Sequence, residues 1–218
     1  MYVRIIIRSL IFLGLTAILP FASAGRLDLP FFWAYLALIF VFWIGCISVA
    51  DPGLLRERMN PGGGGIDRSM RFVMMPIFGA HLVIAGLDVG RFGWSHVPPW
   101  LQYVGLAGMA AAYGVSVWAM LVNRFFSPVV RIQAEHGHHV VSSGPYAFVR
   151  HPGYLGTLVL MPAAGLALGS WWSILPNAAC MVLAVRRLLI EDRYLQENLP
   201  GYTEYADRVR YRLLPGVW

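Results

Sequence analysis

The chain has 218 residues, of which 58% are hydrophobic and 13% are charged, and its formal net charge is +6. A bilayer crossing takes about 20 apolar residues, and several uninterrupted runs reach that length. All of the basic residues except histidine are arginines, and no aromatic-basic motif accompanies them. The positive charge is therefore better explained by arginines sorted to one side of a membrane than by nucleic-acid binding.

Five apolar stretches follow one another along the chain. Four are each suited to one spanning helix, and they cover residues 5–24, 31–50, 72–90 and 101–122. The fifth, 153–185, is too long for one crossing and is broken by prolines and by Gly169-Ser170. It is either one kinked helix or a hairpin, and a Gly-Ser pair followed by two tryptophans favours a hairpin turn at the membrane interface.

These stretches predict an all-α, polytopic transmembrane protein with about five to six spanning helices, a cytoplasmic connector and a C-terminal helical tail. We treat 1–218 as a single integral membrane domain. Within it, 1–122 forms four N-terminal spans, and 123–218 forms a cofactor-binding connector, the last helical hairpin and the tail.

Arginines concentrate before the first span, between the second and third, after the fourth and in the tail, whereas the opposite loops carry only Arg26 and Arg91. The positive-inside rule then places both termini in the cytoplasm, and we expect a bacterial inner membrane. Two arginines, an apolar run and "FASAG" at 21–25 also fit a cleavable signal peptide, but the run is long enough to span.

The polar segments should form loops and short helices. Four glycines in "NPGGGGIDRS" (60–69) indicate a mobile loop, and the Lys-Ser/Thr of a P-loop does not follow them. Residues 123–152 should form a compact connector with little regular helix. Residues 186–206 suit a helix that leaves the bilayer and is broken by Pro200-Gly201, with a short helix through Tyr205 after it.

The sequence gives little support for a metal site or for hydrolase chemistry. His136, His138 and His139 are crowded together, but cysteines are absent around them and the nearby carboxylates lack a ligand spacing, so we predict no metal site. Ser142-Ser143 lacks the context that exposes a nucleophile. Cys46 and Cys180 lie in apolar runs, where a small buried residue is the default interpretation.

Arg187 and Glu191 are four residues apart, hence on one helical face. Taken alone they suit a solvated ion pair. They occur, however, where the last span emerges, and the connector that carries Arg150 and His151 must return to the membrane at the same depth. Interfacial charges of this kind are costly and mark a site hypothesis.

Three motifs, "VVSSGPYAFVRHPGYLG" (140–156), "RRLLIED" (186–192) and "GYTEYADRVRYRLLPGVW" (201–218), resemble the isoprenylcysteine carboxyl methyltransferase family, which is related to phospholipid N-methyltransferases. The resemblance covers residues 120–218 and implies S-adenosyl-L-methionine as the cofactor. It places Arg187 toward a substrate carboxylate, as the catalytic residue. Asp192 departs from the commoner Glu-Glu pair. The positions that match the family's cofactor contacts are Gln133, His138, His139, Val140, Val141, Tyr146, His151, Pro152, Gly153, Tyr154 and Glu191.

We therefore predict a membrane methyltransferase whose partners are the lipid bilayer and a membrane lipid or isoprenoid-like small-molecule acceptor. An isoprenoid carboxylate, a phospholipid amine and a small thiol stay open as acceptors. The alternatives are an NADPH-dependent membrane reductase of sterol-reductase type and a non-catalytic membrane scaffold or transporter subunit. Asp88, Arg91 and His96 are better explained as interface anchors than as a transport relay.

Overall fold

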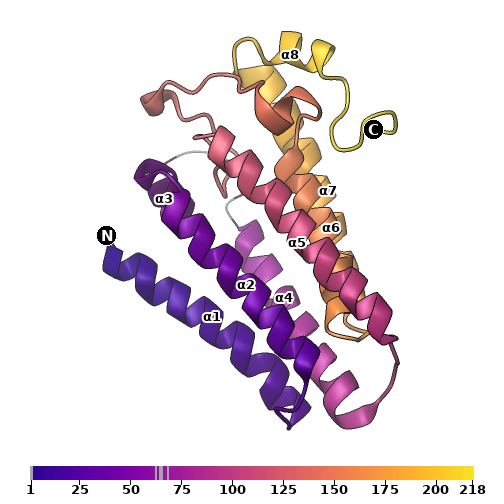
Figure 1. The fold of residues 1–218 in the computed structure, drawn as a ribbon. Helices are drawn as coiled ribbons and strands as arrows, with labels where there is room; N and C mark the ends of the chain where they lie inside the picture. Colours follow the sequence, from indigo (N-terminus) through magenta and orange to yellow (C-terminus); the bar gives the residue numbers. More distant parts are fainter. Residues whose placement is uncertain (1, 62, 64–65, 68) are drawn as a thin grey trace. The chain divides into compact units, whose positions relative to one another are not determined.

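The computed structural model describes residues 2–61, 63, 66–67 and 69–218, and all its regular elements are helices (Figure 1). Residues 62, 64, 65 and 68, which belong to the loop predicted at 60–69, lie outside the described residues. The elements in chain order are α1 (Tyr2–Ala24), α2 (Pro30–Val49), α3 (Pro52–Met59), α4 (Met70–Gly86), the π-helical η1 (Leu87–Phe92), α5 (Pro99–Val122), the 3₁₀ turns η2 (Ala134–His136) and η3 (Gly144–Ala147), α6 (Pro152–Ala167), α7 (Ile174–Asn198) and α8 (Tyr202–Arg208).

Four helical segments are long and apolar enough to cross a membrane, and they confirm the four predicted N-terminal spans. They are Ile6–Ala24, Pro30–Val49, Phe72–Phe92 and Pro99–Val122. The apolar helix α6 is shorter. The chain is therefore a polytopic helical membrane protein, as predicted.

The apolar stretch 153–185 is a helical hairpin rather than one kinked helix. Helix α6 ends at Ala167, and α7 begins at Ile174 after a turn in which Gly169 has φ +80°. The side-chain amide of Asn177 on α7 donates to the carbonyl of Met161 on α6 at 2.7 Å, so the two helices run back along each other. Pro162 lies inside α6 without ending it.

Contacts divide the chain into two compact units. Unit 1 comprises Met1–Gly45, Phe72–Ala110 and Val159–Met181. Its buried polar centre is Asp88, which accepts hydrogen bonds from the Ser95 backbone N–H and hydroxyl and from the Ser170 hydroxyl at 2.6 Å. Asp88 is thus buried and joins the π-helical segment to the hairpin turn by hydrogen bonds.

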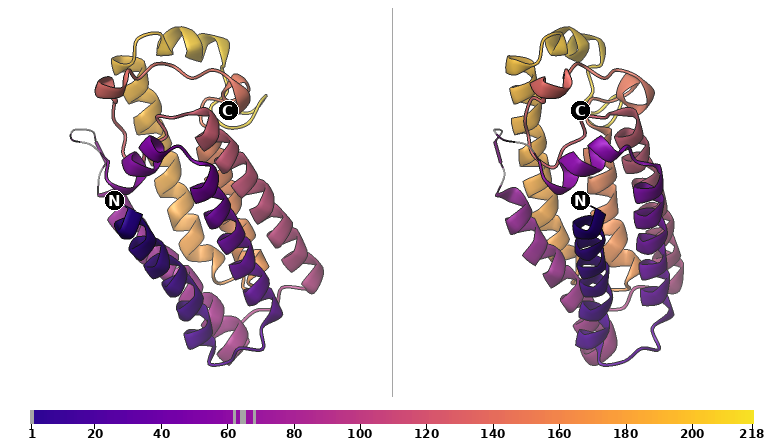
Figure 2. Two further views of the ribbon diagram at one scale, coloured as in Figure 1. Left: turned by 60° about the vertical axis from the view of Figure 1, so that its left-hand side comes forward. Right: turned by 90° about the vertical axis from the view of Figure 1, so that its left-hand side faces the viewer.

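Unit 2 comprises Cys46–Arg71, Ala111–Leu158 and Val182–Trp218. Between α5 and α6 the connector contains only the two 3₁₀ turns, as predicted, and it lies beside α8 and the C-terminal tail (Figure 2). A core of Leu199, Tyr202 and Tyr205 packs against Ile132 and Val140 of the connector. Helix α8 and the break at Gly201, which has φ +83°, agree with the predicted tail.

Helices α5 and α6 approach closely within unit 2. A Cβ at Gly156 would lie 2.2 Å from the Ser116 hydroxyl and 2.7 Å from the Ala112 carbonyl oxygen. Only a glycine allows this approach, so Gly156 lets α5 and α6 pack closely.

Candidate active site

An ion pair joins α3 to the connector at one edge of unit 2. The Arg131 guanidinium donates to both oxygens of Glu57, from Nη2 at 2.6 Å and from Nε at 2.9 Å, and both side chains are buried. Ser127 also donates to Glu57. The hydrogen bond to Glu57 is the main reason why the pKa of Arg131 is raised. A two-pronged pair of this type fixes geometry as well as charge, so it sets the position of α3 against the connector.

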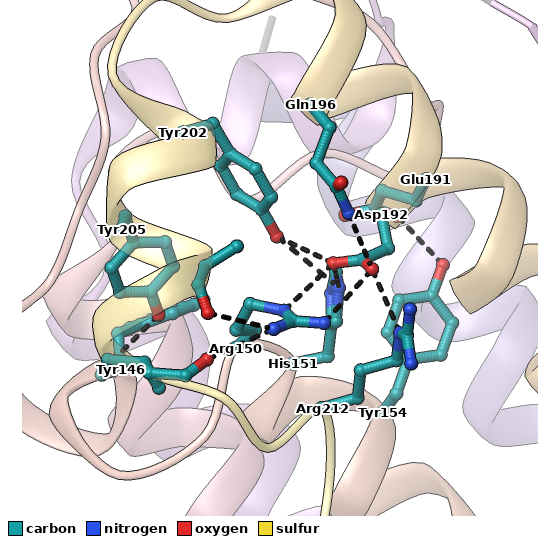
Figure 3. A network of polar contacts seen from close by, with 12 residues as sticks. Tyr146, Arg150, His151, Tyr154, Glu191, Asp192, Gln196, Tyr202, Tyr205 and Arg212 are labelled. Atoms are coloured by element: carbon teal, nitrogen blue, oxygen red, sulfur yellow. Dashed lines mark hydrogen bonds and ion pairs between the residues drawn. The ribbon is translucent and has the colours of Figure 1, made fainter. Parts of the chain in front are cut away.

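Asp192 is the centre of the largest polar network (Figure 3). Its side chain is 1% exposed and accepts six hydrogen bonds, three at each oxygen. The donors come from the connector, α7, α8 and the tail. They are Arg150 Nε (3.0 Å), His151 Nε2 (3.0 Å) and the Tyr202 hydroxyl (3.1 Å) at Oδ1, and Arg150 Nη2 (3.2 Å), Gln196 Nε2 (3.0 Å) and Arg212 Nε (2.9 Å) at Oδ2.

The network keeps Asp192 ionised. Burial by itself would raise the pKa of this carboxyl group, but the hydrogen bond and charge of His151, together with Arg212 and Arg150, hold the pKa below its ordinary value. A buried carboxylate is tolerated only when it is paired and hydrogen-bonded in this way. Asp192 therefore joins four chain segments as a structural anion.

Backbone bonds join the tail to the same region. The Arg150 N–H donates to the Tyr211 carbonyl and the His151 N–H to the Arg212 carbonyl, both at 2.9 Å. The Tyr205 hydroxyl donates to the Tyr146 carbonyl at 2.7 Å. The connector is thus held by the tail on both sides of the turn that precedes α6.

Glu191, next to Asp192 on α7, makes a separate contact with α6. It accepts a hydrogen bond from the Tyr154 hydroxyl at 2.8 Å through Oε2, and its Oε1 has no such bond to any described residue. The Tyr154 phenol also feels the charge of Arg187. The Arg187 side chain is 12% exposed, and its Nη2 donates to the Pro128 carbonyl. Within the described residues its Nε makes no hydrogen bond and lies 3.8 Å from Asp67 Oδ2.

A second group of predicted residues surrounds Phe125 in the connector. The His138 ring stacks on Phe125 with centroids 4.3 Å apart, and its Nδ1 accepts from the Gln133 backbone N–H. The Gln133 side chain donates to the Phe125 carbonyl. Burial, with the nearby charges of His139 and Arg131, lowers the pKa of His138 to about 4. His138 is therefore neutral near pH 7.

The remaining predicted positions take different places. The exposed His139 presents its ring edge to Phe125. The Tyr146 hydroxyl accepts from Asn123 at 3.2 Å. Val140 packs partly on the α8 core, and Val141 is half-buried. Pro152 and Gly153 are buried in the first turn of α6. The structure thus brings His151 to Tyr154 together with Glu191 and Arg187, and groups Gln133, His138 and His139 around Phe125.

His151 is buried and bonded to other residues of unit 2. Its side chain is 4% exposed, and its Nε2 is bonded to Asp192 and lies 3.5 Å from the Tyr202 hydroxyl. The ring contacts Tyr154 edge-on at 5.9 Å. In this arrangement His151 packs against the Tyr154 ring and supports its position.

Several residues of this region carry no role in the sequence prediction. Tyr202 and Arg212 were quoted only as part of a motif, although an aromatic hydroxyl and an arginine near a buried acid are the usual signals of such a network. Asn123 links the Phe125 group to Tyr146. Arg58 on α3 lies over the Phe126 ring, 5.2 Å from its centroid. In the described part of the chain, no three His, Cys, Asp or Glu side chains gather as metal ligands.

Part of the chain is similar to known proteins. Residues 104–198 match the model of the isoprenylcysteine carboxyl methyltransferase (ICMT) family. The chain is 30% identical over 133 residues to the cobalt-zinc-cadmium resistance protein CzcN of Cupriavidus metallidurans, and the match covers 58% of this chain and 56% of that protein. It therefore spans about half the length of that relative.

The fold is similar to the solved structure of the eukaryotic intramembrane Ras methyltransferase ICMT. The TM-score is 0.62 and the identity 20%, over 94% of this chain and 73% of that chain. The family match includes the connector, the hairpin and the Glu191-Asp192 pair. Residues 104–198 are therefore similar to the isoprenylcysteine carboxyl methyltransferase family, which the motifs of the chain also resemble.

Proposed function

We propose that the chain transfers a methyl group from S-adenosyl-L-methionine to a lipid-like or small acceptor at the cytoplasmic face of a membrane. The observation that carries the proposal is the convergence of two distant motifs. The first turn of α6 meets α7 through the 2.8 Å bond between Tyr154 and Glu191, and the half-buried Arg187 lies one helical turn before Glu191 with its Nε unbonded in the described structure.

The residues present fit such a cofactor. Glu191 uses one carboxylate oxygen for Tyr154 and keeps Oε1 for an amine or hydroxyl group. The half-buried His138, which stacks on Phe125, offers an aromatic ring to an adenine, and the exposed His139 offers a polar ring beside it. When bound, S-adenosylmethionine supplies a methyl group on a sulfonium, and transfer of that group to a nucleophile leaves a neutral thioether.

The chain's own residues then need only bind the cofactor and the acceptor and orient them toward each other. Arg187 provides a guanidinium for an anionic acceptor, and its bond to the Pro128 carbonyl holds the side chain in one direction. Tyr154 and Glu191 hold each other in place, and His151 packs against the Tyr154 ring. An acceptor that is already an anion loses no proton, so no side chain has to act as a general base. Positioning of this kind supplies much of the rate enhancement in such transfers.

Titration calorimetry of the purified full chain with S-adenosylmethionine tests the proposal. We expect saturable binding, and no heat at about 1 mM ligand, a limit of about −4 kcal/mol, would refute it. NADPH in the same experiment tests the reductase alternative.

Arg187→Ala should abolish methyl transfer and leave cofactor affinity within about 2-fold of the wild type, because Arg187 is proposed to bind the acceptor and not the cofactor. Arg193→Ala, an exposed arginine on the same helix, is the matched control. Equal loss of binding and transfer would reassign Arg187 to the cofactor.

A further inference from the structure

Arg58 is a fixed, half-buried cation. It lies on α3, whose N-terminus is capped by Asp51 and whose Glu57 is bonded to Arg131 and Ser127. Its guanidinium carbon is 5.2 Å from the centroid of Phe126, a cation–π distance. Phe126 in turn packs against the cluster of Ala50, Leu54 and Met120. The arginine is therefore held by its helix and by an aromatic ring.

No carboxylate of the described residues pairs with Arg58. The adjacent acid, Glu57, directs both oxygens to Arg131 and Ser127. Burial is the main reason why the pKa of Arg58 is lowered, Cys46 acts in the opposite direction, and the charge of Arg187 lowers the pKa further. Another arginine is thus among the groups that act on Arg58. Two half-buried cations near each other are unfavourable unless an anion joins them.

Arg58 is placed next to the candidate active site through Phe126. A Cβ at Gly153 would lie 2.6 Å from the Phe126 ring, so the ring covers the first turn of α6 beside Tyr154. Arg187 bonds to Pro128, two residues beyond Phe126. Its nearest acid, Asp67, stays 3.8 Å from Nε, and Asp67 Oδ2 is itself buried without a hydrogen bond in the described structure. Neither arginine is neutralised by a close, hydrogen-bonded carboxylate.

We infer that Arg58 is a second acceptor-binding cation, which together with Arg187 recognises an anionic oxygen group on a lipid-like acceptor. The inference rests on the proposed function and deepens it, because two arginines disfavour an amine and a neutral thiol as the group that faces them. Arg58 lies outside residues 104–198, so the acceptor preference is set partly by a segment that the family match does not include.

Three probes with hydrocarbon chains of similar length test the inference on the full chain in nanodiscs of zwitterionic lipid. They are N-dodecanoylglycine, its neutral carboxamide and dodecyl phosphate. Because each charge-assisted contact contributes about 10-fold in affinity, we expect the wild type to bind an anionic probe about 100-fold more tightly than the carboxamide. Arg58→Gln should reduce this preference to about 10-fold, and Arg58→Lys should retain more of it than Arg58→Gln.

Arg56→Gln, an exposed arginine on the same helix, is the matched control and should keep the wild-type preference. Tighter binding of the carboxylate or of the phosphate identifies which anion the acceptor carries, and either supports the inference. It is overturned if the wild type binds the carboxamide equally well, binds none of the probes, or keeps its preference in Arg58→Gln. The assay needs no methyl donor, so failure to bind S-adenosylmethionine would refute the proposed function alone.

Discussion

Replacing Asp192 by asparagine tests whether the six-donor network holds unit 2 together. The substitution keeps the shape but removes the charge that Arg150 and Arg212 share. It also turns one acceptor oxygen into an NH₂ group that faces donors, whichever way the amide is oriented. Removing one partner of a buried ion pair costs about 3–5 kcal/mol, because the other charge is left buried and unpaired.

For a chain of this length each kcal/mol shifts the unfolding midpoint by about 2–4 °C, so Asp192→Asn should melt roughly 6–20 °C below the wild type. The measurement is thermal unfolding in detergent, followed by the monodisperse peak in size-exclusion chromatography. Proteolysis should also cut the tail between Arg208 and Arg212 sooner, since Arg212 loses its partner.

Asp207→Asn makes the same chemical change at an exposed site on α8 and should melt within about 1 °C of the wild type, as surface substitutions do. If Asp192→Asn melted as Asp207→Asn does, with an unchanged proteolysis pattern, the carboxylate would not be what joins the connector, α7, α8 and the tail.

Three further outcomes are expected. Tyr154→Phe removes the hydroxyl that holds Glu191 and should weaken S-adenosylmethionine binding about 3- to 10-fold in calorimetry, with little change in the melting temperature. Unchanged affinity would show that Glu191 does not contact the cofactor. Because His138 stays neutral down to about pH 4 while its unfolded form binds a proton below 6.5, stability should fall as pH drops from 6.5 to 4. Because solvent screens the half-buried ring, this change in the free energy of unfolding should be about 1–2 kcal/mol. His138→Gln should remove this part of the dependence of stability on pH between 6.5 and 4. Gly156→Ala should destabilise the chain by about 1–3 kcal/mol, since its Cβ meets a backbone oxygen at 2.7 Å, and equal melting would contradict the close approach.

The spans and the hairpin were predictable because hydrophobic length is a local property. Each predicted N-terminal span agrees with a helix to within a few residues, and the Gly169-Ser170 turn divides the last apolar stretch where the sequence indicated. Helix α3 was not predicted, since its eight residues mix apolar and charged side chains with no helical period. Its position depends on the ion pair of Glu57 with Arg131, 74 residues away.

The candidate site was predictable only as far as its motifs extend. The convergence of Tyr154 with Glu191 followed from two motifs that must meet where the membrane ends. The partners of Asp192 could not be inferred from the motifs. Tyr202 follows the turn of the chain at Gly201, and Arg212 lies beyond α8. Arg58 carries no local signal at all. Its contact with the Phe126 ring and the lack of a paired carboxylate among the described residues become visible in three dimensions.

Glu191 and Asp192 contact different parts of unit 2 because of helix geometry. Adjacent residues on an α-helix point about 100° apart, so one carboxylate can face α6 while the other faces the connector and α8. Glu191 has the longer reach and, as far as the structure describes the chain, bonds through Oε2 alone, which leaves Oε1 available to a ligand. Asp192 is enclosed by donors between 2.9 and 3.2 Å on both oxygens, with no room for a further methylene. The shorter acid, which departs from the commoner Glu-Glu pair, is therefore the side chain that this shell of donors requires.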